Sequence, residues 1–214
     1  MRNLLAVAAL LLGTNSLASA NVIYTNSIGN GNQKFAGSVG MDFQVNSTIT
    51  ITSLGAFDSG QDGFTNSILI QLYDLSNLAS PYVFTSTGTG ATGTLIGGSR
   101  FYAIKPIVLS AGFKGSIVAS GFNINDLNGN ASIPNFTGAA TDTLGGAISF
   151  VGSSRYDNTA GIFPLTIDSG SPNKYQAGTF IASAGGAVSA PEPGAFSLVV
   201  LGGLLIGFSR RIQS

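Results

Sequence analysis

Two short loops of the chain carry oxygen-bearing side chains at spacings that suit a hard cation. In the stretch FDSGQDGF, Asp58 and Asp62 stand four residues apart. In NDLNGNAS, Asp126, Asn128 and Asn130 occupy alternate positions, which is the spacing of the first ligands in a calcium-binding loop. Carboxylate and amide oxygens on a tight turn can converge on Ca²⁺, so these five residues are the candidate metal ligands.

Both loops also have a purely structural interpretation. The second loop has Ala131 where a calcium loop of the EF-hand type needs glycine, and Thr137 where it needs a bidentate glutamate. Aspartate and asparagine side chains hydrogen-bond to nearby backbone in turns without any metal. A calcium site and a structural turn therefore stay open as alternatives, and no cofactor other than Ca²⁺ is expected.

Side chains suited to catalysis are scarce. The 214 residues include no histidine and no cysteine, which removes the imidazole base, the thiolate nucleophile and the commonest zinc ligands. Asp58 and Asp62 could only be a glycosidase pair if one pKa were raised, and a hydrated, glycine-rich turn does not do that. Ser171 and Lys174 fit an S-x-x-K pattern, but the flanking residues show no helical period. We therefore expect that the protein is not an enzyme.

Nucleotide and nucleic-acid binding are not expected either. Gly88, Gly90 and Gly93 form a G-x-G-x-x-G, but a dinucleotide site needs a helix N-terminus directly afterwards, and here a predicted strand follows. Residues 86–98 are predicted to be a loose surface loop instead. The chain has only nine lysines and arginines, scattered along its length, which is too few for a basic face that neutralises adjacent phosphates.

The elements that must position these loops are predicted to be strands. Apolar residues recur with period two at 48–52 and 67–73. The first of these strands should turn Ile49 and Ile51 to the core and its three threonines to solvent, whereas the second is apolar on both faces and should be central. Weaker strand candidates are residues 43–45, 82–85, 100–104, 107–109, 116–120, 147–151, 163–167 and 178–182.

The composition supports a fold without helices. The chain has 30 glycines, and Glu192 is its only glutamate. Many short strands separated by turn residues, with no intervening helical period, indicate an all-β fold: a single β-sandwich or jelly-roll-like domain over residues 21–182. Because the chain lacks cysteine, packing and backbone pairing alone must stabilise this domain.

The N-terminal segment reads as a secretory signal peptide. Residues 1–20 combine a basic start at Arg2, a short apolar stretch and the small-residue pattern Ala18-Ser19-Ala20. The apolar stretch is much shorter than the roughly 20 residues that a membrane-spanning helix needs, so cleavage before Asn21 is expected. The protein should therefore be exported.

The C-terminal segment has three parts in a fixed order. A flexible linker at 183–190 leads to Pro191-Glu192-Pro193, then to an apolar helix at 194–209, and finally to Arg210-Arg211. The helix would be about 24 Å long, which is short for a bilayer core of about 30 Å. The two arginines should keep its end on the cytoplasmic side. A plain tail anchor and a tail that is removed after insertion are both compatible with this order.

The tail resembles the PEP-CTERM sorting signal of Gram-negative bacteria, through the Pro-Glu-Pro motif, the run GAFSLVVLGGLLIGF and the closing arginine pair. This resemblance implies recognition and cleavage by an exosortase-type membrane protease, membrane insertion before processing, and delivery to the cell surface or extracellular matrix. The stretches ITSLGAFDSGQDGF, ILIQLYD and GSRFYAI also look like an uncharacterised β-sandwich domain that is often found with such tails.

Together these features predict an exported cell-envelope or extracellular-matrix protein without enzymatic activity. The alternative is a carbohydrate-binding module that acts on extracellular polysaccharide, since β-sandwiches present flat aromatic surfaces to sugars. The tyrosines that could provide such a surface are Tyr82, Tyr102, Tyr156 and Tyr175.

The sorting hypothesis predicts the mass of the mature protein. In the native host, intact-mass spectrometry should find a chain that begins near Asn21 and ends close to the Pro191–Pro193 motif. Replacing Glu192 with Ala should leave the unprocessed tail in the membrane fraction. A mature chain that still ends at Ser214 would contradict the hypothesis.

Overall fold

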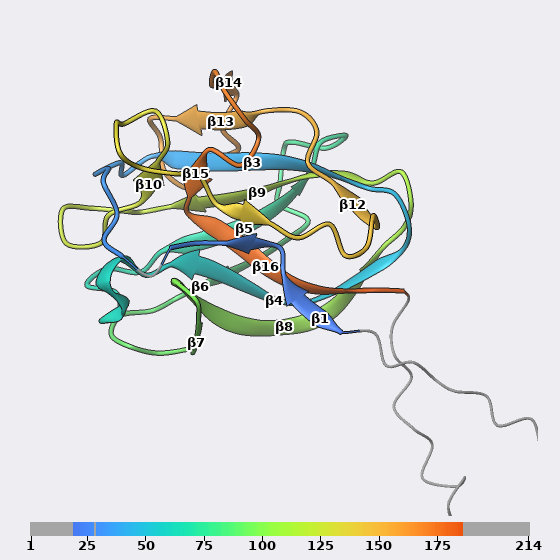
Figure 1. Ribbon diagram of the computed structural model, residues 1–214, viewed down its shortest axis with the longest axis horizontal. Coiled ribbons are helices and arrows are strands. Elements are labelled where there is room, and N and C mark those ends of the chain that lie inside the picture. Colours follow the sequence, from blue (N-terminus) through green and yellow to red (C-terminus); the bar gives the residue numbers. More distant parts are fainter. Residues whose placement is uncertain (1–18, 28, 186–214) are drawn as a thin grey trace, which may run out of the picture.

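Two antiparallel sheets packed face to face make up the part of the chain that the computed structural model describes, residues 19–27 and 29–185 (Figure 1). One sheet has the order β1 (Ala20–Val22), β16 (Gly178–Ala184), β4 (Ile49–Phe57), β8 (Ser99–Leu109), β7 (Thr94–Ile96). The other has the order β14 (Thr166–Ile167), β13 (Ser154–Asp157), β3 (Ser38–Val45), β9 (Lys114–Ser120), β5 (Leu69–Asp74), β6 (Val83–Ser86), and β12 (Ile148–Ser149) also pairs with β3.

Two short ribbons lie beside these sheets. β10 (Gly129–Asn130) pairs with β15 (Tyr175–Gln176), and β2 (Tyr24–Thr25) pairs with β11 (Ala140–Thr141). The only helical element in the described part of the chain is one 3₁₀ turn, η1 (Ser59–Gln61). The predicted all-β, sandwich-like fold is therefore confirmed.

The core lies between the two sheets and has a cluster of aromatic rings at its centre. Phe180 of β16 is fully buried, and its ring centroid lies 5.1 Å from that of Phe43 on β3 and 6.2 Å from that of Tyr24. Apolar side chains of both sheets surround these rings, among them Ile51 and Ile117. With no disulfide to link the sheets, this contact is what holds them together.

The two strongest strand predictions are confirmed as β4 and β5. Ile49 and Ile51 are fully buried, as expected for the core face of β4. The expectation that all the threonines of this strand face solvent is wrong for Thr50, which is only 4% exposed. Its hydroxyl donates to the carbonyl of Gly185, so the C-terminal end of β16 covers it.

The weaker strand candidates differ in length from the strands observed. Residues 100–104 and 107–109 form one continuous strand, β8, although Pro106 interrupts them. The pairing of β8 with β4 shifts register between Ile51 and Ser53, opposite this proline. Proline lacks a backbone N–H, so a bulge with no ladder hydrogen bond accommodates it.

The glycine-rich segment 86–98 is not a loose loop. It contains strand β7, and Phe64 and Gly90 exchange two backbone hydrogen bonds of 3.1 and 2.6 Å. At Gly98 a side chain is sterically excluded, because a Cβ would lie 1.7 Å from the carbonyl oxygen of Ser27. The predicted loop is therefore fixed in place from two sides.

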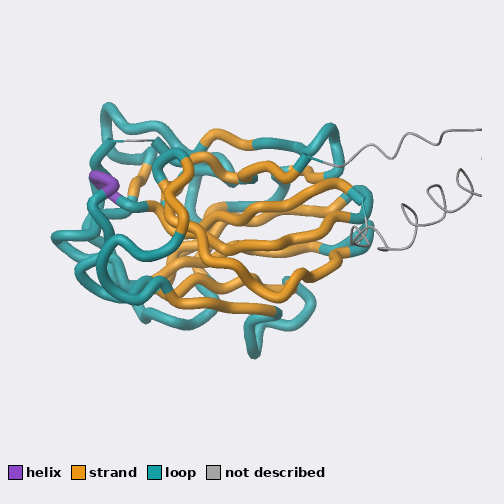
Figure 2. Tube along the Cα trace, turned by 90° about the horizontal axis from the view of Figure 1, so that it is seen from below, coloured by secondary structure: helices purple, strands orange, loops and turns teal. Residues whose placement is uncertain are grey.

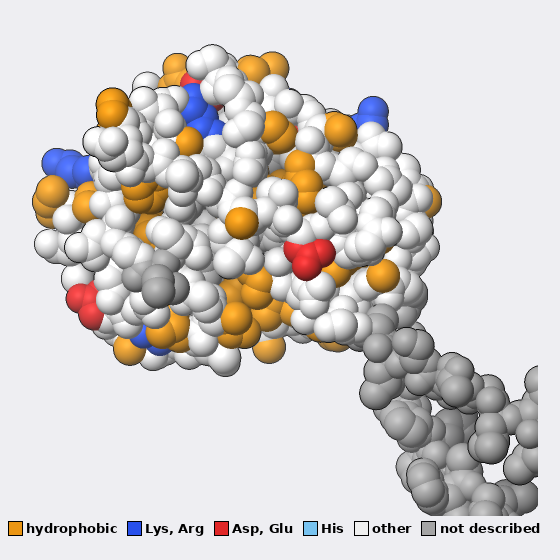
Figure 3. Space-filling model, viewed as in Figure 1, with side chains coloured by type: hydrophobic (Ala, Val, Ile, Leu, Met, Phe, Trp, Pro, Cys, Tyr) orange, Lys and Arg blue, Asp and Glu red, His pale blue; other side chains and the backbone are white. Residues whose placement is uncertain are grey.

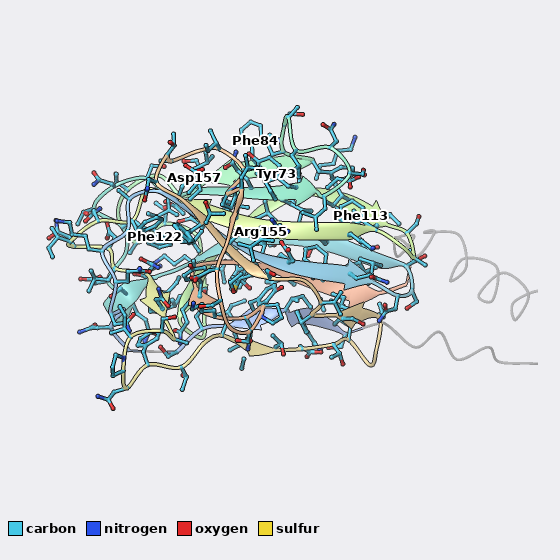
Figure 4. The ribbon with its side chains drawn as sticks, turned by 90° about the horizontal axis from the view of Figure 1, so that it is seen from above. Tyr73, Phe84, Phe113, Phe122, Arg155 and Asp157 are labelled. Carbon is cyan, nitrogen blue, oxygen red and sulfur yellow. The ribbon has the colours of Figure 1, made fainter. Side chains whose placement is uncertain are left out.

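A segment after β13 covers the outer face of the larger sheet. The ring of Phe163 packs edge-to-face on Tyr73 at 5.1 Å, and the guanidinium of Arg155 lies 5.5 Å from the Phe163 ring centroid. Arg155 and Tyr73 are both seen on this side of the sheet in Figure 4. The predicted strand 163–167 is therefore shorter than expected. Only β14 pairs in the sheet, whereas Phe163 packs over the face of the sheet.

The two ends of the described chain lie side by side. Ala20 of β1 pairs with Ser183 of β16, so both ends leave from the same end of the sandwich (Figures 1 and 2). Ser183 and Ala184, expected in the linker, belong to β16. The remainder of the linker, the sorting motif and most of the signal peptide lie outside the described residues. Within the described ranges, no helix is long and apolar enough to cross a membrane.

The aromatic core predicts a large difference between two phenylalanines. Phe180→Ala should lower the free energy of unfolding by about 3–5 kcal/mol, because it leaves a cavity between the sheets. Phe84→Ala, at a side chain that is 63% exposed on β6, should change it by less than about 0.5 kcal/mol. Urea unfolding followed by tyrosine fluorescence measures both, and similar losses for the two variants would contradict this account of the core.

Candidate functional site

A cleft of about 280 Å³ opens where β3 begins, between the β10–β15 ribbon and the β13–β14 pair. The strands β10, β13 and β15, which contribute lining residues, are labelled in Figure 1. Its walls combine aromatic, amide and carboxylate side chains. The lining residues are Gln33, Phe35, Val39, Asn130, Ser132, Tyr156, Asp168 and Tyr175.

One wall of the cleft is aromatic. Tyr156 lies on β13 directly opposite Val39 of β3, so the pairing of these strands sets its position. Phe35, just before β3, meets Tyr156 edge-to-face with ring centroids 6.4 Å apart and planes at 78°. Both rings are half-buried, which leaves part of their surface open to the cleft.

The lining also contains two side-chain amides, those of Gln33 and Asn130. Asn130 is held from both sides: its N–H donates to Oδ1 of Asn32 at 2.8 Å, and Nδ2 of Asn32 donates to its carbonyl at 3.1 Å. The side-chain Oδ1 of Asn130 accepts from the N–H of Ser132 at 2.8 Å. Gln33 is fixed by the fully buried Asn128, whose Nδ2 donates to Oε1 of Gln33 at 2.8 Å. The orientations of both amides are therefore set by the protein.

An ion pair lies at the third side of the cleft. Oδ2 of Asp168 accepts from the hydroxyl of Tyr175 at 2.5 Å and lies 2.9 Å from Nζ of Lys174. Burial alone would raise the pKa of Asp168, but the hydrogen bonds from Tyr175 and Lys174 outweigh it and hold that pKa below its usual range. Burial, with the adjacent Asp168, raises the pKa of Tyr175. Both groups therefore keep one protonation state across the neutral range.

This combination suits the binding of a ligand that is apolar on one face and polar at its edges. Half-buried rings supply a flat contact surface, and the fixed amides supply directional hydrogen bonds. A pyranose ring has this shape and polarity. The pKa of Asp168 is lowered and that of Tyr175 is raised, so neither group changes protonation near neutral pH and the arrangement favours binding over proton transfer.

The two members of the first pair of candidate metal ligands have different surroundings. Asp58 is 1% exposed, and its Oδ2 lies 2.5 Å from Nε of Arg100. Burial raises the pKa of Asp58, while the hydrogen bond and charge of Arg100 act in the opposite direction. Asp62, by contrast, is exposed on the turn that follows η1. The two carboxylates thus lie in different environments.

The alternating set Asp126, Asn128 and Asn130 sends its side chains to three different partners. Asp126 accepts from the backbone of Thr65 and Asn66, whereas the two asparagines hold the cleft wall described above. Among the residues described, no three acidic, histidine or cysteine side chains form a group that could hold a metal. Calcium binding at these five residues stays a prediction. Four of them, Asp58, Asp126, Asn128 and Asn130, make hydrogen bonds to other parts of the protein.

The other predicted residues fall inside and outside the cleft. Tyr156 and Tyr175 line it, while Tyr82 packs on Phe113 elsewhere, with ring centroids 5.7 Å apart. Lys174 of the S-x-x-K motif is buried in the ion pair with Asp168. Sequence reasoning missed Gln33, Phe35, Ser132 and Asp168, which stand in irregular segments without any periodic signal.

Comparison of the chain with protein-family models, with curated proteins and with solved structures gives no match.

The capping role of Asp126 predicts a pH-dependent stability effect. Asp126→Asn should lower the free energy of unfolding at pH 7 by about 1.5–3 kcal/mol, because hydrogen bonds to a charged acceptor are lost. Burial alone would raise the pKa of Asp126, but hydrogen bonds from Thr65, Asn66 and Asn123 lower it overall. A carboxyl group whose pKa is lowered in the folded protein stabilises the fold at pH values above its pKa in the unfolded chain, about 3.9. This contribution is lost as the pH falls through the lower, folded pKa.

The difference between Asp126→Asn and the unmodified protein should therefore shrink below about pH 4 in urea unfolding curves. Asp62→Asn makes the same chemical change on an exposed side chain and should shift stability by less than about 0.5 kcal/mol. Equal effects of the two variants at pH 7 would contradict the capping role. In the same assay, the calcium hypothesis requires added Ca²⁺ to raise the urea concentration at the midpoint of unfolding.

Proposed function

We propose that this protein is exported, is inserted in the membrane by its C-terminal tail until that tail is processed, and binds extracellular polysaccharide through the cleft without catalysis. The binding proposal rests on the side chains that line the cleft. It joins the Phe35–Tyr156 aromatic pair to the amides of Gln33 and Asn130 within about 280 Å³. That volume is close to the lower end of the range for small-molecule sites, so it suits one or two sugar units.

The position of the cleft supports a displayed binding module. The cleft lies where β3 and β16 begin, whereas the chain ends lie where β16 finishes and β1 starts. A strand of seven residues spans about 23 Å, so the cleft and the chain ends are at opposite ends of the sandwich. A tail in the membrane would leave the cleft directed outward. The signal-peptide pattern and the sorting-type tail support export.

The proposal predicts that one aromatic residue controls polysaccharide retention. Tyr156→Ala should weaken binding about tenfold, because it removes the ring against which a sugar would stack. The measurement is affinity electrophoresis of the full-length chain through gels that contain neutral or acidic polysaccharides, in a detergent without a sugar headgroup.

Tyr82→Ala is the matched control, since Tyr82 is 52% exposed but lies outside the cleft. It should be retarded as strongly as the unmodified protein. If no polysaccharide retards the protein, or if the two alanine variants behave alike, the cleft is not a carbohydrate site.

A further inference from the structure

We infer that the cleft selects uncharged sugar units and binds them as hydrogen-bond acceptors, through the side-chain NH₂ groups of Gln33 and Asn130. This inference rests on the proposed function, because it names the class of glycan that the same cleft would bind. The side-chain oxygens of both amides are already bonded to the protein, at 2.8 Å from Asn128 Nδ2 and at 2.8 Å from Ser132 N–H. Neither NH₂ group has a hydrogen-bond partner among the described residues.

The network around Gln33 fixes which end of its amide faces the cleft. Asn128 Nδ2 also donates to the carbonyl of Gly129 at 3.4 Å, so exchanging the oxygen and nitrogen of Asn128 would bring two acceptors together. In this arrangement Gln33 accepts from Asn128 through its Oε1 at 2.8 Å. Backbone hydrogen bonds of 2.9 and 3.0 Å between Gln33 and Asn128 hold the two residues in place. The NH₂ group is left as the donor toward the cleft.

The charges around the cleft disfavour an acidic ligand. Asp168 carries the negative charge that lines it, and the nearby Lys174 is 4% exposed and bonded to Asp168 and to the carbonyl of Ser169. No cationic side chain lines the cleft in the described part of the chain. A uronate carboxylate would therefore lose hydration beside Asp168 without gaining an ion pair. A hydroxyl or acetamido oxygen can accept from the two NH₂ groups without that cost.

The central test exchanges one donor for an acceptor. Gln33→Glu keeps the oxygen that accepts from Asn128 and replaces the NH₂ group with a second carboxylate oxygen. Retention by neutral probes, cellohexaose and hexa-N-acetylchitohexaose on a solid support, should fall at least about tenfold, which corresponds to about 1.4 kcal/mol. Gln44→Glu makes the same change on β3 outside the cleft and should leave retention unchanged.

Two further measurements keep the inference open to refutation if Gln33→Glu fails to fold. Asn130→Asp removes the second donor while keeping the oxygen that accepts from Ser132, and it should also weaken retention of the neutral probes. The unmodified protein should bind the neutral probes more tightly than polygalacturonate. Tighter binding of polygalacturonate, or unchanged binding by a folded Gln33→Glu variant, would overturn the inference while leaving carbohydrate binding intact. Binding of neither class would overturn the proposed function itself.

Discussion

The buried ion pair between Asp58 and Arg100 fixes the loops at one end of the sandwich. Nε of Arg100 lies 2.5 Å from Oδ2 of Asp58, and its two terminal nitrogens donate to the carbonyls of Ala91 and Gln61 at 3.1 and 3.0 Å. A single side chain of β8 thereby joins the turn after β4 to the segment before β7. Removing one partner of a buried pair typically costs about 3–5 kcal/mol, because the other charge is left without compensation. The side chain of Arg100 therefore holds both loops against β8.

From this ion pair a chain of hydrogen bonds reaches the cleft. Phe64, next in the same turn, is bridged to Gly90, and Asp126 accepts from the N–H groups of Thr65 and Asn66. The segment after Asp126 then pairs with residues 32–33 and places the two amides of the cleft. Hydrogen bonds between buried polar groups of this kind restrict the arrangement of the segments that they join. The cleft wall thus depends on contacts well outside it, which keeps its donors oriented before any ligand arrives.

The sequence predicted regular strands better than it predicted the cleft, for a physical reason. In β4 and β5 the alternation of apolar residues reflects the two faces of a strand, so periodicity located both. The burial of Thr50 depends on where the end of β16 lies, which no local pattern encodes. The cleft draws Phe35, Asn130 and Tyr156 from segments far apart in the chain, and their spacing carries no signal until the sheets have formed. For the Asx-rich segments the sequence predicts two roles that it does not separate, since a calcium ligand and a backbone cap use the same side-chain oxygens.

The chain has few charged residues, and most of the cations near its core and its cleft are paired with aspartates inside the fold. Three of the six cations in the described residues form ion pairs within the fold: Arg100 with Asp58, Arg155 with Asp42 and Lys174 with Asp168. Lys34, Lys105 and Lys114 remain exposed, and Figure 3 accordingly shows few charged side chains on the face that it presents. With the guanidinium groups of the described residues in internal pairs, this part of the chain has little long-range field with which to attract an acidic polymer. Under the proposed function, recognition by the cleft would rely on ring contact and neutral hydrogen bonds, which are less sensitive to salt concentration than ion pairs are.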